Sequence, residues 1–199
     1  MNTINRGFCD HQTTPERLLM DINNTDTQIF MVGRGGQGIL VLARALSEIA
    51  FKKGRRLITS ETHGMAMRGG TVTASLKIGK FASPLIPAGC ADILIGLEQN
   101  DARDYLHMLK PGGITIVNTE DRNDFTYSVD ASGIALNQGL KGSANMIMLG
   151  FVIRYINTDF YDACAVMESI SPKRVLDKNI KALEIGFETA SNEKYNQSH

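Results

Sequence analysis

The residues that could do chemistry begin with a glycine-rich segment. It satisfies the pattern G-x-G-x-x-G over six residues, Gly33, Arg34, Gly35, Gly36, Gln37 and Gly38. A strand is predicted before it and an amphipathic helix after it, and in that context the glycines let the backbone approach a phosphate at the helix N-terminus. Glu61 closes the next predicted strand, where dinucleotide-binding proteins place a ribose-holding carboxylate. The pattern suggests nucleotide or phosphate binding, but a tight crossover also needs glycine, and the loop's amides could instead bind another protein.

A second unusual stretch follows directly. Its ten residues are Glu61, Thr62, His63, Gly64, Met65, Ala66, Met67, Arg68, Gly69 and Gly70. The three glycines indicate sharp turns or close approach by another backbone, and the methionines offer an adaptable apolar contact surface. Each residue taken singly has an ordinary structural explanation. Together they favour a functional loop, either a subunit contact or a ligand contact.

Three other polar residues lie near predicted element ends. Asp92 and Glu98 flank a short apolar run at 93–97, and sites in open α/β sheets lie at the carboxyl ends of strands. Glu98 is therefore the better functional candidate, and Asp92 is expected to serve a turn or a cap. Asn145 begins a predicted helix, which favours capping over a side chain directed into the same crevice. No residue is assigned as a general acid or base.

The elements that must position these residues alternate between strand and helix. Buried apolar runs predict strands at 27–32, 55–60, 93–97 and 114–117, and helical periodicity predicts helices after Gly38, at 100–109, at 144–155 and after Pro172. Strict alternation over 71–78 predicts a half-exposed strand, which Gly79 and Lys80 turn into a hairpin with 81–83. The sum is a three-layer α/β/α sandwich with a mostly parallel sheet, an antiparallel edge hairpin and C-terminal helices.

Composition sets the domain organisation and excludes several classes of protein. The 199 residues carry 21 basic and 21 acidic side chains, which argues against nucleic-acid binding through a large basic field. No apolar stretch approaches the length of a membrane span, so a cytoplasmic protein is expected. We expect a polar leader at 1–26, mobile or loosely packed, a single domain at 27–190, and a frayed tail at 191–199.

Cysteine and histidine spacing gives no support for a metal site. The three cysteines, Cys9, Cys90 and Cys164, are far apart and form no CxxC pair, and the four histidines show no ligand spacing. An iron–sulfur cluster normally needs four thiolates, so this chain alone should hold none.

Several separated blocks together resemble one known family. The segments 33–39 and 61–70 are followed in order by Ser83-Pro84-Leu85-Ile86-Pro87-Ala88-Gly89-Cys90-Ala91-Asp92, Leu97-Glu98, Pro111-Gly112-Gly113 and Ala144-Asn145-Met146. They resemble the gamma-type subunit of 2-oxoacid:ferredoxin oxidoreductases over residues 28–187, most closely the beta subunit of indolepyruvate ferredoxin oxidoreductase. That subgroup usually carries Gln between Ala66 and Arg68, where this chain has Met67.

The resemblance implies a Rossmann-like fold and a subunit role. Such complexes decarboxylate a 2-oxoacid on thiamine diphosphate, pass electrons through iron–sulfur clusters to ferredoxin, and transfer the acyl group to coenzyme A. The sequence Gly-Asp-Gly of the thiamine motif does not occur here, so the cofactors are expected on companion chains. The resemblance then implies that the two glycine-bearing loops contact the thiamine-bearing subunits, with Ser83, Pro84, Glu98 and Asn145 as further candidates.

Two other functions remain open at this point. The chain could be a free-standing NAD(P)- or flavin-dependent reductase that uses the glycine loop, or a small-molecule binding domain. As a subunit, it is not expected to be active alone. An apolar interface left without its partner could drive self-association of the isolated chain.

Overall fold

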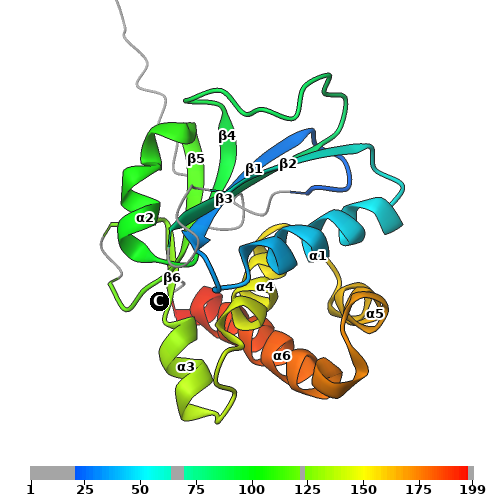
Figure 1. Ribbon diagram of the computed structural model, residues 1–199, viewed down its shortest axis with the longest axis vertical. Helices are drawn as coiled ribbons and strands as arrows, with labels where there is room; N and C mark the ends of the chain where they lie inside the picture. Colours follow the sequence, from blue (N-terminus) through cyan, green and yellow to red (C-terminus); the bar gives the residue numbers. More distant parts are fainter. Residues whose placement is uncertain (1–20, 64–69, 122–123, 197–199) are drawn as a thin grey trace, which may run out of the picture.

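The computed structural model describes residues 21–63, 70–121 and 124–196 and shows a six-stranded mixed sheet (Figure 1). The strand order is β2-β3-β1-β4-β5-β6. The strands are β1 (Thr27–Arg34), β2 (Leu57–His63), β3 (Thr71–Ile78), β4 (Ala91–Gly96), β5 (Leu109–Asn118) and β6 (Tyr127–Val129). β1, β4, β5 and β6 pair in parallel, whereas β3 pairs antiparallel with both β1 and β2. The predicted mostly parallel sheet is confirmed.

Helices cover the two faces of the sheet unequally. One face carries α1 (Ile39–Lys52) and α4 (Ala144–Tyr155), and α5 (Phe160–Ile170) and α6 (Lys173–Asn196) pack outside them, with α3 (Ala131–Asn137) against α4. Among the described residues, the other face carries the short helix α2 (Gln99–Asp104), the 3₁₀ turn η2 (Leu106–Met108) and coil. The predicted three layers and C-terminal helices are present, but one layer is thin. None of the helices that the structure describes is long and apolar enough to span a membrane.

Helix α1 forms where the apolar stripe predicts it. Its buried residues recur at helical spacing and are Ile39, Leu42, Ala43, Ala45, Leu46, Ile49 and Ala50. Gly38 precedes the helix in the left-handed conformation with φ of 82°, and Gly54 follows it with φ of 72°. Both backbone angles disfavour any residue with a Cβ, so glycine sets both ends of this helix.

An antiparallel hairpin is present at the sheet edge, but β3 forms it with the preceding strand β2 and not with 81–83 as predicted. β3 pairs with β2 at the sheet edge, while Phe81–Ser83 form coil rather than a strand. The alternation over 71–78 indicates that one face of the strand is polar and the other is buried. It does not indicate which neighbouring strand β3 pairs with. Because β3 lies between β1 and β2, the true edge strand is β2.

The predicted helix at 100–109 is too long. α2 ends at Asp104, and β5 already begins at Leu109, so Pro111, Gly112 and Gly113 lie inside a strand instead of ending a helix. The β4–β5 ladder passes from Ala91 opposite Leu109 to Ile93 opposite Ile114, so residues 110–113 bulge out. A bulge accommodates Pro111, which has no N–H to donate to the ladder.

The structure describes residues on both sides of the domain expected at 27–190. Ile22 lies in the core with 1% exposure, and the Arg55 guanidinium donates to the carbonyls of Asn23 at 2.8 Å and Thr25 at 3.1 Å. Within the expected leader, the Ile22 side chain and the carbonyls of Asn23 and Thr25 therefore contact the domain, and residues 1–20 lie outside the described part. At the other end, α6 continues to Asn196, past the boundary predicted at residue 190.

Helices α4 and α6 cross with their backbones in near contact. A Cβ on Gly150 would lie 2.0 Å from the Leu183 carbonyl oxygen, and a Cβ on Gly186 would lie 1.9 Å from the Ile147 carbonyl oxygen. Backbone carbonyls cannot turn aside as side chains can, so both positions require glycine. This crossing fixes α4, whose first turn carries Asn145.

We predict that Gly186→Ala lowers the free energy of unfolding by about 3 kcal/mol, because the new methyl group forces the two helices apart. Gly139→Ala is the control: its φ is 66° but no atom lies within 4 Å of the added Cβ, so only the backbone strain of about 1–2 kcal/mol applies. Urea unfolding followed by circular dichroism measures both. Equal losses would contradict the close approach of α4 and α6.

Candidate functional site

The candidate site lies at the carboxyl ends of β1 and β4, where the chain changes sides of the sheet. After β1 the chain enters α1 on one face, and after β4 it enters α2 on the other face. Such a switch point opens a crevice between the two strand ends, which is where α/β proteins bind ligands. Arg34 ends β1, and Leu97 and Glu98 directly follow β4. All three residues therefore lie at the two strand ends that border this crevice.

The two sequence segments singled out for function meet at this edge. The Gly35 N–H donates to the Gly70 carbonyl oxygen at 2.9 Å, and Arg34 pairs with Thr71 across β1 and β3. The exit of the 61–70 loop therefore lies beside the glycine turn. His63 is the last residue of β2, and Gly64, Met65, Arg68 and Gly69 lie outside the described residues.

Several backbone N–H groups of the glycine turn already donate hydrogen bonds within the protein. The Arg34 N–H donates to Gln37 Oε1 at 2.7 Å, and the Gln37 N–H donates to the Arg34 carbonyl at 3.0 Å. With Gly35 bonded to Gly70, three amides of the turn already have acceptors within the protein. A phosphate would have to compete with these bonds, which makes this loop a poorer anion cradle than its sequence pattern suggests.

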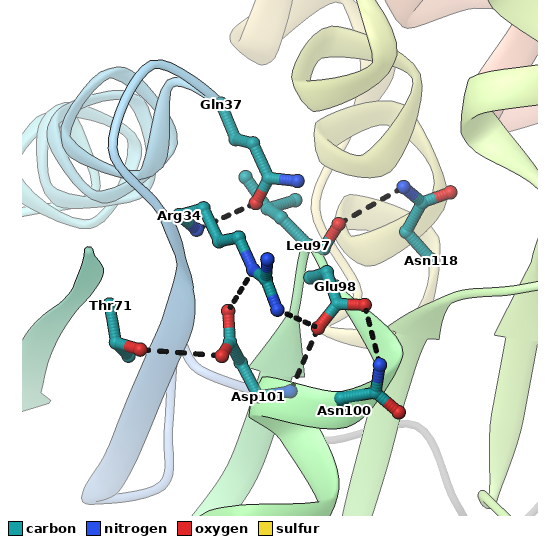
Figure 2. A network of polar contacts seen from close by, with 8 residues as sticks. All are labelled: Arg34, Gln37, Thr71, Leu97, Glu98, Asn100, Asp101 and Asn118. Atoms are coloured by element: carbon teal, nitrogen blue, oxygen red, sulfur yellow. Dashed lines mark hydrogen bonds and ion pairs between the residues drawn. The ribbon is translucent and has the colours of Figure 1, made fainter. Parts of the chain in front are cut away.

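A polar network joins the end of β1 to α2 (Figure 2). Arg34 Nε lies 3.3 Å from Asp101 Oδ2, and its guanidinium reaches Glu98 at 3.7 Å. The Thr71 hydroxyl donates to Asp101 Oδ1 at 3.3 Å. The Asp101 side chain is 9% exposed whereas that of Arg34 is 49% exposed, so a nearly buried carboxylate is neutralised by a cation at the surface. The network ties the ends of β1, β3 and β4 together.

Glu98 has a defined structural role in this network. Its carboxylate accepts the Asp101 N–H at 2.9 Å and caps helix α2, and it also accepts from the Asn100 amide at 3.3 Å. The sequence singled out Glu98 from its place after a strand, but it gave Asp101 no role. Asp101 sits three residues after Glu98, the spacing of a helix cap and its amide donor, and that spacing is the signal that could have linked them.

Asn145 does not cap its helix, contrary to the favoured expectation. It lies inside the first turn of α4, and its Nδ2 donates to the Gly38 carbonyl at 3.5 Å. A Cβ on Gly38 would lie 2.2 Å from this Nδ2. The Asn145 side chain thus contacts the glycine turn and not Glu98. Asn145 therefore packs on the turn that begins α1, and it lies between two cavities.

The two cavities separate residues that a dinucleotide site would bring together. A cavity of about 600 Å³ contains Glu61 and Arg44, and a cavity of about 400 Å³ contains Gly36 and Gln37; Asn145 borders both. Because β3 is inserted, β2 lies two strand spacings, roughly 10 Å, from β1. Glu61 is thus displaced from the position in which it could hold the ribose of a nucleotide bound at the glycine turn.

Two predicted site residues lie elsewhere. Ser83 and Pro84 belong to the coil after β3, and because β3 runs antiparallel to β1, this coil leaves the sheet at the amino end of β1 (top of Figure 1). Asp92, expected to serve a turn or a cap, instead lies within β4, where it accepts the Gln28 N–H at 2.6 Å and pairs with Lys110 at 2.5 Å. The site thus consists of the glycine turn, the end of the 61–70 loop, Glu98, Asp101 and Asn145.

Comparisons with known proteins agree on one family. Residues 28–189 match the family model described as pyruvate ferredoxin/flavodoxin oxidoreductase. Indolepyruvate oxidoreductase subunit IorB of Archaeoglobus fulgidus is 32% identical over 81% of this chain and 94% of its own. A subunit gamma common to pyruvate and ketoisovalerate oxidoreductases of Thermococcus kodakarensis is 31% identical over 78% of this chain and 92% of its own. The crystal structure of pyruvate oxidoreductase subunit PORC from Thermotoga maritima superposes with a TM-score of 0.70 at 25% identity, covering 83% and 97% of the two chains.

We predict that Arg34→Ala lowers the free energy of unfolding by about 1–2 kcal/mol, because the nearly buried Asp101 carboxylate loses its cation while water partly screens the exposed guanidinium. Arg103→Ala is the matched control. It removes exposed ion pairs with Asp121 and Asp124 and should cost about 0.5 kcal/mol or less. Thermal unfolding of both variants, completed by a double-mutant cycle with Asp101→Ala, measures the difference. A coupling energy near zero between Arg34 and Asp101 would contradict a stabilising role of this network in the site.

Proposed function

The chain belongs to the pyruvate ferredoxin/flavodoxin oxidoreductase family as a gamma-type subunit of 2-oxoacid:ferredoxin oxidoreductases, and we propose that its carboxyl-edge loops complete the active site of thiamine-bearing partner subunits. In this proposal the partners carry out the oxidative decarboxylation to acyl-CoA in the cytoplasm, and ferredoxin accepts the electrons. The glycine turn and the 61–70 loop close over the partner's reaction centre and keep water from the carbanion-like intermediate.

The observation that carries this proposal is a carboxyl edge whose polar groups are largely bonded to one another. Arg34 pairs with Asp101 and Glu98, and Gln37 and Gly70 accept amide hydrogens of the glycine turn. Such bonds favour a preformed surface, which lowers the entropic cost of binding another protein. The bonded amides of the turn are also less available to a phosphate.

The two cysteines in the described part of the chain do not fit an iron–sulfur cluster. Cys90 and Cys164 are free and belong to different elements, and the described residues contain no group of three or more His, Cys, Asp or Glu side chains placed to hold a metal ion. Burial raises the pKa of the Cys164 thiol, and the nearby Glu168, Glu184 and Asp159 raise it further, so this cysteine stays protonated at neutral pH. We therefore assign the clusters, together with thiamine diphosphate and the coenzyme A chemistry, to the assembled complex.

Indolepyruvate is the proposed substrate of that complex. The IorB relatives are about as long as this chain and carry the name indolepyruvate oxidoreductase. The Thermococcus relative is named as a subunit common to two oxidoreductases with different 2-oxoacids. That supports placing most side-chain selectivity on the larger subunits, with the 61–70 loop, including Met67, adding a smaller contribution.

The test is co-expression of this chain with the larger thiamine-binding subunit. Wild type should co-purify and restore 2-oxoacid oxidation, whereas this chain alone should show none. Arg68→Ala should leave the melting temperature of the free chain nearly unchanged, since a surface truncation costs about 0.5 kcal/mol or less. In the complex it should cost about 2–5 kcal/mol of binding or transition-state stabilisation, because it leaves a desolvated partner group unpaired.

One outcome would contradict this assignment. If Arg68→Ala assembles and turns over as wild type does, the 61–70 loop is not the working surface. A second variant, Gly69→Val, should also impair the complex; if it lowers the melting temperature of the free chain strongly, its loss of assembly is a folding effect and only the Arg68 result counts.

The alternative, an NAD(P)- or flavin-dependent reductase, rests on the G-x-G-x-x-G pattern alone. We predict that titration calorimetry with NADH or NADPH detects no binding in the micromolar range, because three amides of the turn are already bonded and Glu61 lies in a different cavity. Micromolar affinity that Gly35→Ala abolishes would favour the reductase instead.

A further inference from the structure

A cavity of about 400 Å³ lies beside the glycine turn, at the carboxyl ends of β1, β4 and β5. Its walls are the glycine turn, the residues that end β5 or directly follow β4, helix α3 and the first turn of α4. Its volume falls in the range of about 300–1,000 Å³ that is typical of small-molecule sites. It also lies at the strand ends where open α/β sheets bind ligands, so the chemistry of its walls determines which ligand fits.

Part of the cavity wall is apolar. Leu97 and Ala135 line it and are buried in the core, while Leu136, the next residue of α3, also lines it and is 69% exposed. A flat apolar ligand placed against these residues would remove the Leu136 side chain from water, which favours binding through the hydrophobic effect. The wall therefore favours a ligand with an apolar body.

The glycine turn and α3 supply hydrogen-bond donors to the same cavity. Gln37 Oε1 accepts the Arg34 N–H, and the Gln37 Nε2, which makes no hydrogen bond to another described residue, is directed away from Arg34 (Figure 2). Asn118 Nδ2 donates to the Ser132 hydroxyl oxygen at 2.9 Å, so the hydroxyl hydrogen of Ser132 is available to a ligand. Both groups donate, which suits a ligand that carries oxygen acceptors.

Lys141 is the charged side chain among the described residues that line this cavity. The loop that carries it is held in place, because the Leu140 N–H donates to the Ala135 carbonyl at 2.8 Å and the Lys178 ammonium donates to the Lys141 carbonyl at 2.6 Å. The Lys141 ammonium itself makes no hydrogen bond or ion pair with another described residue. An unpaired ammonium with a second one nearby gives this end of the cavity a positive potential.

The edge becomes negative on the side of α2. An adjoining cavity shares Gln37 and Leu97 with the first one, but it is lined by three carboxylates, those of Glu98, Glu120 and Asp121. An anionic group is attracted toward the lysine and repelled by these carboxylates. A ligand with one negative end therefore binds in one orientation.

We propose that the cavity binds a small carboxylate with a flat apolar body, the carboxylate at Lys141 and the body against Leu97, Ala135 and Leu136. An aromatic 2-oxoacid has this chemistry, and its keto oxygen adds an acceptor for Gln37 or Ser132. The aryl carboxylic acid without the keto group shares all but that acceptor. The choice of the 2-oxoacid rests on the proposed function, in which it is the substrate of the complex and would be held at the edge that faces the partner.

Titration calorimetry of the full chain with indolepyruvate, indoleacetate and indole tests the ligand class. Indole should bind at least tenfold more weakly than either carboxylate, because it lacks the group that pairs with Lys141. Indolepyruvate should bind more tightly than indoleacetate, because its keto oxygen accepts a further hydrogen bond. Equal or weaker binding of indolepyruvate would overturn the choice of the 2-oxoacid, and indole that binds as tightly as the carboxylates would overturn the site.

Two lysine variants test the charged end. Lys141→Met keeps the length of the side chain but removes the ammonium, so it should weaken both carboxylates at least tenfold and leave indole within twofold of wild type. Lys80→Met is the matched control, because Lys80 is also exposed but follows β3 at the amino end of β1, and it should bind all three ligands as wild type does. Added salt should weaken the carboxylates in wild type more than in Lys141→Met.

Two apolar variants test the other end. Leu136→Ser should weaken all three ligands about fivefold, because each loses the apolar surface that it covers. Phe51→Ser is the control: Phe51 is 68% exposed but lies on α1 and does not line the cavity, so this variant should bind within twofold of wild type. Both are surface truncations, and thermal unfolding should show nearly unchanged melting temperatures.

The results separate this inference from the proposed function. Absence of carboxylate binding to the free chain, or wild-type affinity of Lys141→Met, overturns the cavity site, while the proposed function survives as long as Arg68→Ala impairs the complex. Conversely, carboxylate binding that Lys141→Met abolishes, together with a fully active Arg68→Ala complex, would keep the site for an aryl carboxylate and contradict the proposed function.

Discussion

The insertion of one antiparallel strand, β3, between β1 and β2 determines which parts of this chain meet. Its first residue, Thr71, pairs with Arg34, so the end of the 61–70 loop lies beside the glycine turn. Its last residue, Ile78, pairs with Thr27, so the following coil leaves at the other end of the sheet. It also displaces β2, and with it Glu61, from the glycine turn. A nucleotide-type sequence pattern therefore occurs in a chain whose topology separates the parts that a nucleotide would need.

An ion pair links the carboxyl ends of β1 and β4. Arg34 reaches across to Asp101 and Glu98, while Asn145 supports the turn from α4, whose own place is fixed by the glycine contacts with α6. The packing of α4 in the core thus holds Asn145 against the glycine turn at the surface edge. In the proposed function, in which the chemistry takes place on partner chains, such an edge is useful because it positions loops against a partner.

The elements that carry strong local signals could be predicted from the sequence. The apolar stripe and the flanking glycines of α1, the buried runs of β1 and β4, and the Ser171-Pro172 start before α6 all agree with the structure. The prediction was wrong where strand pairing, or a contact between residues far apart in the sequence, determines the structure. The alternation of β3 could not reveal its neighbours, and Pro111 stops a helix in isolation but fits a bulge in β5. Asp101 was missed because its partner, Arg34, lies 67 residues away in the sequence.

Hydrogen–deuterium exchange of the chain alone and within the co-expressed complex tests the central claim most directly. The account predicts strong additional protection in the complex at residues 34–38 and 70–71 and at the start of α2, while the solvent-facing turns of α5 exchange at the same rate in both states. The same carboxyl-edge peptides should not change when NADH is added to the chain alone. Unchanged exchange at this edge in an assembled, active complex would contradict the assignment of the edge as the working contact with the thiamine-bearing subunit.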